Sequence, residues 1–246
     1  MISAPSHYEI SLPQMLFSVV SIAAAFLLLA GFAWHLASRG EVWTWWGPLT
    51  VAAGMAAADL GSGLVHWGAD TWGRDDFPLI GHRLLVPFRV HHVNPDDFLR
   101  RSFVDTNGDV AFLAIPLVAV LFLIPLDTWW GGPAAVAGFA FCGVGMLTNQ
   151  IHQWAHMPEP PPVVRLLQDC SIILGRVEHA AHHERPYDVH YCITTGWCNG
   201  AAEAVGLFRN LERGITRVTG ARPRQDDLRY EQRYGVSAAT GAGGHG

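Results

Sequence analysis

An apolar run of 22 residues near the start of the chain, Leu16 to Ala37, most constrains the fold. Only Ser18, Ser21 and His35 interrupt it. As a helix rising about 1.5 Å per residue, the run is long enough to cross a bilayer core of about 30 Å. The apolar core of a signal peptide is shorter, about 7–15 residues, and follows a basic segment that is missing here. We therefore expect a membrane span.

The composition and three further apolar stretches extend this expectation to the whole chain. Half of the 246 residues are hydrophobic and only 15% are charged, against about 25% charged residues in soluble domains. Additional spans are predicted at about 46–65, 110–126 and 134–152, with tryptophans beside them that suit an interfacial belt. The sequence thus predicts an all-α integral membrane protein, a single domain over residues 1–246, with about four transmembrane helices.

The distribution of arginine predicts the orientation of these spans. With four spans, residues 67–109 and 153–235 lie on one side of the membrane, together with the N-terminus; we call these two segments the cap. Of the 16 basic residues, all are Arg and only Arg39 lies on the opposite side. The positive-inside rule then makes the cap cytoplasmic. We expect a multi-pass protein of a bacterial inner membrane, with a flexible tail at 237–246.

The thirteen histidines of the chain are concentrated on the cap side. His152 and His156 are four residues apart, and a second set has the spacing i, i+3, i+4, so each set shares one face of a helix. An adjacent pair lies in the first cap segment, and a histidine and an acid four residues apart end the second predicted span. The topology brings all nine to one membrane boundary: His66, Asp70, His91, His92, His152, His156, His179, His182 and His183.

Nine such side chains exceed the three or four ligands of a tetrahedral zinc site. They fit two metal ions with open positions, and imidazole-rich ligation suits iron, zinc or copper. The adjacent His91 and His92 reach two metals or flank one between them. Histidines 82 and 190 fall outside the spacing pattern, which leaves either a role beside the ligands or a surface position. Histidines 7, 35 and 245 stand alone, and we expect no function for them.

Around these residues the chain resembles the Kua/CarF-type lipid desaturases, whose characterised members are plasmanylethanolamine desaturases. The similarity covers roughly residues 59 to 230. The matching segments are DLGSGLVHWGADTWG at 59–73, PFRVHHVNP at 87–95, FVDTNGD at 103–109, NQIHQWAH at 149–156, LLQD at 166–169, HAAHH at 179–183, YCITTGWCN at 191–199 and VTGARPRQDDLR at 218–229. The family's histidines and its acid fall on the nine residues that the spacing had selected.

The resemblance implies a reaction, its cofactors and its partners. Two iron ions, which zinc can replace during purification, would use O2 and electrons from a carrier of the cytochrome b5 or ferredoxin type. Hydrogens would be removed from adjacent carbons of a phospholipid chain near the head group. The main expectation is conversion of plasmanylethanolamine to the vinyl ether plasmenylethanolamine. The alternative within the same di-iron class is desaturation of a phospholipid acyl chain.

Several further residues have expected supporting roles. Asp59, an acid inside a predicted span, and Asn149 are candidate partners that orient metal ligands. Four cap arginines, namely Arg83, Arg89, Arg100 and Arg101, are candidates for binding a lipid phosphate, or they serve topology alone.

Two other classes of protein remain possible from the residues. A membrane zinc hydrolase would need three histidines and a general base such as Glu178 or Glu184. A haem carrier would place paired histidines inside the spans, whereas here nearly all lie at span ends. The net charge of −5 gives no basic surface for nucleic acid, so none is expected as a partner.

Overall fold

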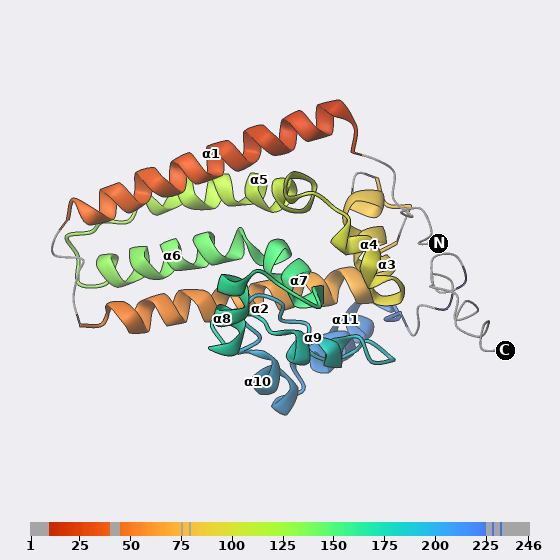
Figure 1. Cartoon of the computed structure of the whole chain (residues 1–246). Coiled ribbons are helices and arrows are strands. Elements are labelled where there is room, and N and C mark those ends of the chain that lie inside the picture. Colours follow the sequence, from red (N-terminus) through yellow and green to blue (C-terminus); the bar gives the residue numbers. More distant parts are fainter. Residues whose placement is uncertain are drawn as a thin grey trace.

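The computed structural model describes residues 10–39, 45–74, 76–78 and 80–224, together with residues 228 and 232. Within these residues the regular secondary structure is entirely helical. Four long rods lie side by side, and shorter helices cover one end of them (Figure 1). The predicted all-α fold is confirmed. The flexible tail predicted at 237–246 lies outside the described residues.

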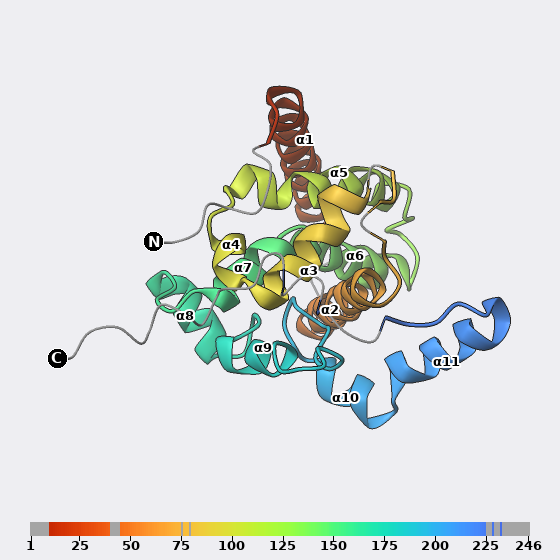
Figure 2. The same ribbon diagram turned by 90° about the vertical axis from the view of Figure 1, so that its right-hand side faces the viewer.

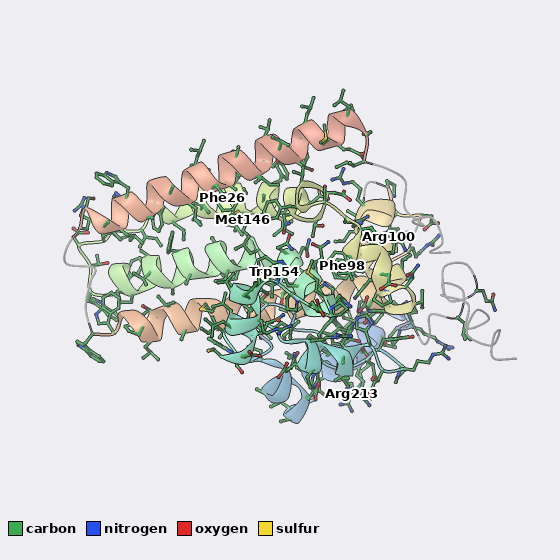
Figure 3. All side chains as sticks on the ribbon, viewed as in Figure 1. Phe26, Phe98, Arg100, Met146, Trp154 and Arg213 are labelled. Carbon is green, nitrogen blue, oxygen red and sulfur yellow. The ribbon has the colours of Figure 1, made fainter. Side chains whose placement is uncertain are left out.

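The rods correspond to the expected spans. They are α1 (Leu12–Ala37), α2 (Gly47–Thr71), α5 (Phe103–Leu121) and α6 (Gly131–Gly145), the last continued by α7 (Thr148–His156). Three of them, α1, α2 and α5, are long and apolar enough to cross a membrane. The pair α6 and α7 is bent by 45° and supplies a fourth candidate span if it crosses as one. Met146 marks the break between these two helices (Figure 3).

Close packing joins the rods in two pairs, because α1 packs against α5 and α2 against α6. Small residues make the second contact possible: a Cβ added at Gly54 would lie 2.2 Å from the carbonyl oxygen of Ala137. Between the pairs, Phe32, Val118 and Val136 belong to one buried apolar cluster. The rods alternate in direction along the chain, so α2 and the pair α6 and α7 both run toward the cap end of the bundle (Figure 1).

Two helices extend beyond the apolar stretches from which they were predicted. Helix α2 continues past residue 65 to Thr71, and α5 begins at Phe103 instead of near 110. Their added turns carry polar side chains that are buried, among them His66 and Asn107. The helix N-terminus of α5 is capped by the hydroxyl of Ser102, which accepts a hydrogen bond from the Asp105 amide. Hydropathy could not find these turns, because they are buried in protein and not in lipid.

The cap consists of short helices. They are η2, a π-helix (Gly81–Leu85), α3 (Val86–Val93), α4 (Pro95–Leu99), α8 (Pro162–Asp169), α9 (Arg176–His182), α10 (Asn199–Ala204) and α11 (Leu207–Thr219). Seen along the rods, α3, α4, α7 and α9 gather over the end of the bundle, while α11 extends to one side (Figure 2). The four cysteines are free thiols.

Tryptophans mark the opposite end of the rods. Trp45 is 89% exposed before α2, and Trp129 is 91% exposed before α6. The start of α6 lies against the start of α2, since a Cβ added at Gly132 would lie 3.3 Å from the ring of Trp46. Exposed tryptophans at one level are typical of a membrane–water interface. The distance along a rod from this level therefore measures depth in the bilayer.

The contact at Gly54 gives a test of the bundle. We predict that Gly54→Ala destabilises the protein by about 1–3 kcal/mol, because the new methyl group would push α2 away from the backbone of α6. Gly68→Ala on the same helix is the matched control, since a Cβ there meets nothing within 4 Å. The control should keep or raise the unfolding midpoint, as alanine favours helix. Thermal unfolding in detergent measures both; equal midpoints for the two variants would contradict the packing.

Candidate metal centre

The C-terminal end of α2 carries the first two candidate ligands on one face. His66 is fully buried and Asp70, four residues later, is 2% exposed. The Asp70 carboxylate Oδ2 lies 3.3 Å from Nε2 of His66, 3.4 Å from Nε2 of His92 and 3.6 Å from Nε2 of His182. Both carboxylate oxygens are buried without a hydrogen-bond partner. Such a group is costly unless a cation neutralises it.

Backbone carbonyls fix the orientation of two of these rings. Nδ1 of His66 lies 3.1 Å from the carbonyl oxygen of Tyr191, and Nδ1 of His182 lies 2.7 Å from that of Val189. A carbonyl only accepts, so each Nδ1 carries the proton and donates it. The neutral ring then presents an unprotonated Nε2 to the centre, which is the form that binds a metal.

The candidate ligands form two adjoining groups. One consists of His66, His91, His92 and His182, with Asp70 beside it; the other consists of His91, His152, His156, His179 and His183. Within each group the ligand atoms of the histidines lie within 4.8 Å of one another. His91 belongs to both groups and His92 to the first, so this adjacent pair supplies ligand atoms to both groups. The structure thus brings together all nine residues selected from the sequence; we call them the metal centre.

The spacing of the nitrogens fits metal coordination. Nε2 of His179 lies 2.9 Å from Nε2 of His152, 2.9 Å from that of His156 and 3.0 Å from that of His183. One neutral imidazole has a single N–H, so these contacts cannot all be hydrogen bonds. At a metal–nitrogen distance of about 2.1 Å, two ligands at right angles are about 3.0 Å apart. The donor set therefore fits a bound metal ion.

Burial keeps the cap histidines neutral. It lowers the pKa of His91, His179 and His182 well below 6.5, and neighbouring histidines lower them further. Burial, followed by the charges of His156 and His92, lowers the pKa of His183 to about 2. Neutral imidazole is the ligand form, so these rings are ready to bind metal at neutral pH. His156 and His183 are only half-buried, so the metal centre is most accessible on their side.

Comparison with known proteins assigns the chain. A model of the lipid desaturase domain matches residues 55–226, which include all nine residues of the metal centre. The chain belongs to the lipid desaturase family. Membership makes it an oxidoreductase that acts on lipid, with histidine clusters that can bind metal.

Individual relatives agree with the family. This lipid desaturase is 38% identical to plasmanylethanolamine desaturase of Myxococcus xanthus over 228 residues, covering 91% of this chain and 79% of that protein. It is 41% identical to plasmanylethanolamine desaturase 1 of Mus musculus over 198 residues, 75% of this chain and 70% of that one. Fatty acid desaturase 4, chloroplastic, of Arabidopsis thaliana is 35% identical over 177 residues, 70% of this chain and 52% of that protein. No solved structure matches.

Asp59 connects α2 to the C-terminal part of the desaturase. Its carboxylate accepts four backbone N–H groups, from Thr194, Thr195 and Gly196 through Oδ1 and from Cys198 through Oδ2, at 2.7–3.1 Å. The carboxylate thus binds the loop Thr194–Cys198. Three residues before this loop is Tyr191, whose backbone carbonyl orients the ring of His66. Asp59 contacts the loop instead of a ligand ring, so its link to the metal centre is indirect.

Amides near the metal centre bind backbone carbonyls. The side-chain amide of Asn149 donates to the carbonyl of Thr106 at 2.9 Å, which fixes α7 against α5. Gln153, beside His152, donates to the carbonyls of Phe98 and Arg101 at 2.8 and 3.0 Å. We had not selected Gln153, although its place next to a candidate ligand was a signal. These bonds hold the helix that carries His152 and His156.

The four cap arginines have varied surroundings. Arg83 forms an ion pair with Asp109 at 2.7 Å, and Arg101 lies 3.6 Å from Asp105. Arg89 is buried and donates to the carbonyl of Gly73. Arg100 is exposed where α4 ends (Figure 3). Of the four, Arg100 alone is exposed, and a role of any of them in phosphate binding stays a prediction.

Aromatic rings and one arginine around the metal centre escaped the sequence analysis. Tyr187 stacks on His92 with ring centroids 4.8 Å apart, and Phe98 packs on His152 at 5.0 Å between α4 and α7 (Figure 3). Arg224 donates from its guanidinium to the carbonyl of Asp70 and from its amide to that of Thr71. In the sequence, the one indication of Arg224 was the resemblance of the segment 218–229 to the family.

The isolated histidines lie apart from the metal centre where they are described. His190 is half-buried; its Nε2 lies 3.2 Å from the carboxylate of Glu203, and its Nδ1 lies 3.1 Å from the Glu178 carbonyl. His35 lies near the tryptophan end of α1, beside Phe32 and Phe122. The side chain of His82, and His7 and His245 entirely, lie outside the described residues.

The bonds to Asp59 give a test of how α2 holds the cap. We predict that Asp59→Ala lowers the free energy of unfolding by on the order of 4 kcal/mol or more, since each unpaired buried N–H costs about 1–3 kcal/mol. Asp127→Ala is the control, because Asp127 is exposed between α5 and α6. Its effect should be within about 0.5 kcal/mol. Unfolding curves in detergent measure both, and similar stabilities for the two variants would show that the bonds contribute little.

Proposed function

We propose that this lipid desaturase is a di-iron enzyme that converts plasmanylethanolamine to plasmenylethanolamine. The observation that carries the proposal is the metal centre, two adjoining histidine groups within a chain about 40% identical to two plasmanylethanolamine desaturases. The first iron would be held by the group of His66, His92 and His182 with Asp70, and the second by the group of His152, His156, His179 and His183, with His91 between them.

The overall reaction balances with one O2 and an external donor. The lipid chain loses one hydrogen from each of two adjacent carbons next to the ether oxygen, and a double bond forms between them. Oxygen receives these two hydrogens, two protons and two electrons from a carrier of the cytochrome b5 or ferredoxin type, giving two molecules of water. When bound, iron supplies the O2-dependent oxidation, as histidine- and carboxylate-ligated iron does elsewhere.

The length of α2 supports a position of this chemistry at the membrane surface. His66 lies 19 residues after Gly47, a rise of about 28 Å from the tryptophan level. The core of a bilayer is about 30 Å thick, so the metal centre lies at the far boundary, where the first carbons of a lipid chain lie. Carbons next to the head group therefore meet the metal centre without leaving the membrane.

Other groups around the metal centre shield its histidine rings from water and orient them. Tyr187 and Phe98 cover two of the histidine rings and keep bulk water from that side. The carbonyls of Tyr191 and Val189 hold two histidines in the ligand tautomer. The excess of arginine on the cap side favours a cytoplasmic metal centre, in a bacterial inner membrane, where reduced electron carriers are found.

A lipid assay tests the function. The chain is expressed in a host supplied with alkyl-ether phosphatidylethanolamine, and extracted lipids are treated with acid, which releases a long-chain aldehyde from a vinyl ether. We expect aldehyde with the native chain. Double bonds in fatty acids without aldehyde would identify the alternative, an acyl-chain desaturase of the same di-iron class. If neither product formed, the proposed function would be contradicted.

The same assay tests the residues. We predict that His152→Ala and His183→Ala each reduce product formation by at least about 100-fold, because each removes a ligand from the group around His179. His35→Ala, at the other end of the bundle, should retain activity within about twofold. All three variants are compared at equal protein level in the membrane. Retained activity in the first two variants would remove the di-iron assignment.

A further inference from the structure

The loop Thr194–Cys198 lies deeper in the membrane than the metal centre. It is bound to Asp59, which stands seven residues before His66 on α2, so it lies about 10 Å closer to the tryptophan level. Measured from Gly47, Asp59 is about 18 Å into a core of about 30 Å. The loop therefore lies at a depth where hydrocarbon surrounds any exposed part of the protein.

Irregular backbone is tolerated at this depth only if its polar groups have partners within the protein. The loop meets that requirement. Four of its N–H groups donate to Asp59, and the carbonyl of Thr194 accepts from the Leu174 amide at 2.9 Å. The hydroxyl of Thr194 lies 2.8 Å from that of Thr148. The indole N–H of Trp197 donates to the carbonyl of Ser171 at 2.6 Å, while the ring is 43% exposed.

The bond from Trp197 to Ser171 also ties α8 to the loop, because α8 ends at Asp169, two residues before Ser171. Along the direction of the rods, α8 lies nearer than α9 to the tryptophan end (Figure 1). Gln168 on α8 donates to the carbonyl of Leu174, which fixes the helix to the chain that bonds the loop. Helix α8 is therefore held on the membrane side of the histidines of α9.

The surface of α8 has three sectors. Val164 is buried against the protein. Val163 and Leu166, 63% and 61% exposed, share a second face with Cys170 because they are spaced i, i+3 and i+7. Arg165 and Asp169 form the third, and line an open groove of about 690 Å³ with Glu159. A helix with protein, apolar and charged sectors suits the boundary between lipid chains and head groups.

We propose that α8 and the loop Thr194–Cys198 are inserted into the membrane leaflet on the side of the metal centre. Val163, Leu166, Ile172 and Trp197 contact lipid chains there, and Arg165 and Asp169 face the head groups. This surface belongs to the cap segment 153–235, which the positive-inside rule predicts on the cytoplasmic side of the membrane. The proposal does not depend on the identity of the substrate or the metal.

Lipid is the partner that the surroundings favour. Leu64 and Val65 are exposed on α2 five and six residues after Asp59, so the candidate span still presents apolar side chains nearer to the cap than the level of Asp59. The charged sector of α8, Arg165 and Asp169, lies on another face of the same helix, where it would contact water and lipid head groups. A protein partner would need no such division along a single helix.

The insertion places lipid chains beside the accessible side of the metal centre. Half-buried His156 is followed directly by Met157, which lines the groove with Arg165 and Leu166. The leaflet would then supply substrate by lateral diffusion, with no need to extract the lipid into water.

Spin labelling tests the insertion without an activity assay. In a chain carrying Cys170→Ser and Cys198→Ser, a nitroxide is attached to V163C or L166C, and in matched controls to R165C or D169C on the same helix. The protein is reconstituted into phosphatidylethanolamine–phosphatidylglycerol vesicles. Collisions with O2, which concentrates in lipid, and with a water-soluble nickel chelate are measured by power saturation.

We expect O2 to relax the labels at 163 and 166 several-fold more than nickel does, and nickel to dominate at 165 and 169. Only variants with the parent's unfolding midpoint are compared, and two positions on each face guard against one that perturbs the helix. Nickel dominance at all four positions would overturn the proposal. That outcome would leave the desaturase function untouched, because the measurement reports the position of the helix alone.

Discussion

The burial of six imidazoles and one carboxylate at one end of a helical bundle, with two half-buried imidazoles beside them, is the constraint on which the structure depends. Asp70 has both oxygens buried without a hydrogen bond, and Nε2 of His66 and of His91 are likewise unpartnered. Removing such groups from water costs several kcal/mol unless cations or hydrogen bonds compensate. Bound metal ions would compensate these groups together, and metal binding would then be coupled to folding of the cap.

One polar stripe of α2 organises the approach of the cap to the bundle. Asp59 binds the loop Thr194–Cys198, Ser62 accepts from the Ile193 amide at 3.1 Å, and His66 bonds Tyr191. Gly63 lies between them, where a Cβ would meet the sulfur of Cys192 at 2.5 Å. A polar stripe on a span is costly in lipid. Here each of Asp59, Ser62 and His66 bonds a residue between Tyr191 and Cys198, and these bonds fix the position of the chain between α9 and α10.

The sequence predicted much of the fold and of the metal centre. Apolar runs located the rods, and the i, i+4 spacing of His152 and His156 located a ligand face, because both depend on local periodicity. The helix ends were missed where polar turns are buried in protein, as at His66 and Phe103. The aromatic cover, Tyr187 and Phe98, and the contact of Arg224 with Asp70 depend on residues far apart in the chain. No local pattern encodes such contacts.

The central claim is that the nine residues hold two iron ions. Metal-free protein titrated with Fe(II) in the absence of oxygen, with bound iron measured after removal of free metal, tests it most directly. The account predicts saturation at two irons per chain, falling to one or fewer when His179 is replaced by alanine. Saturation at a single metal ion per native chain, or binding of zinc without any binding of iron, would contradict it.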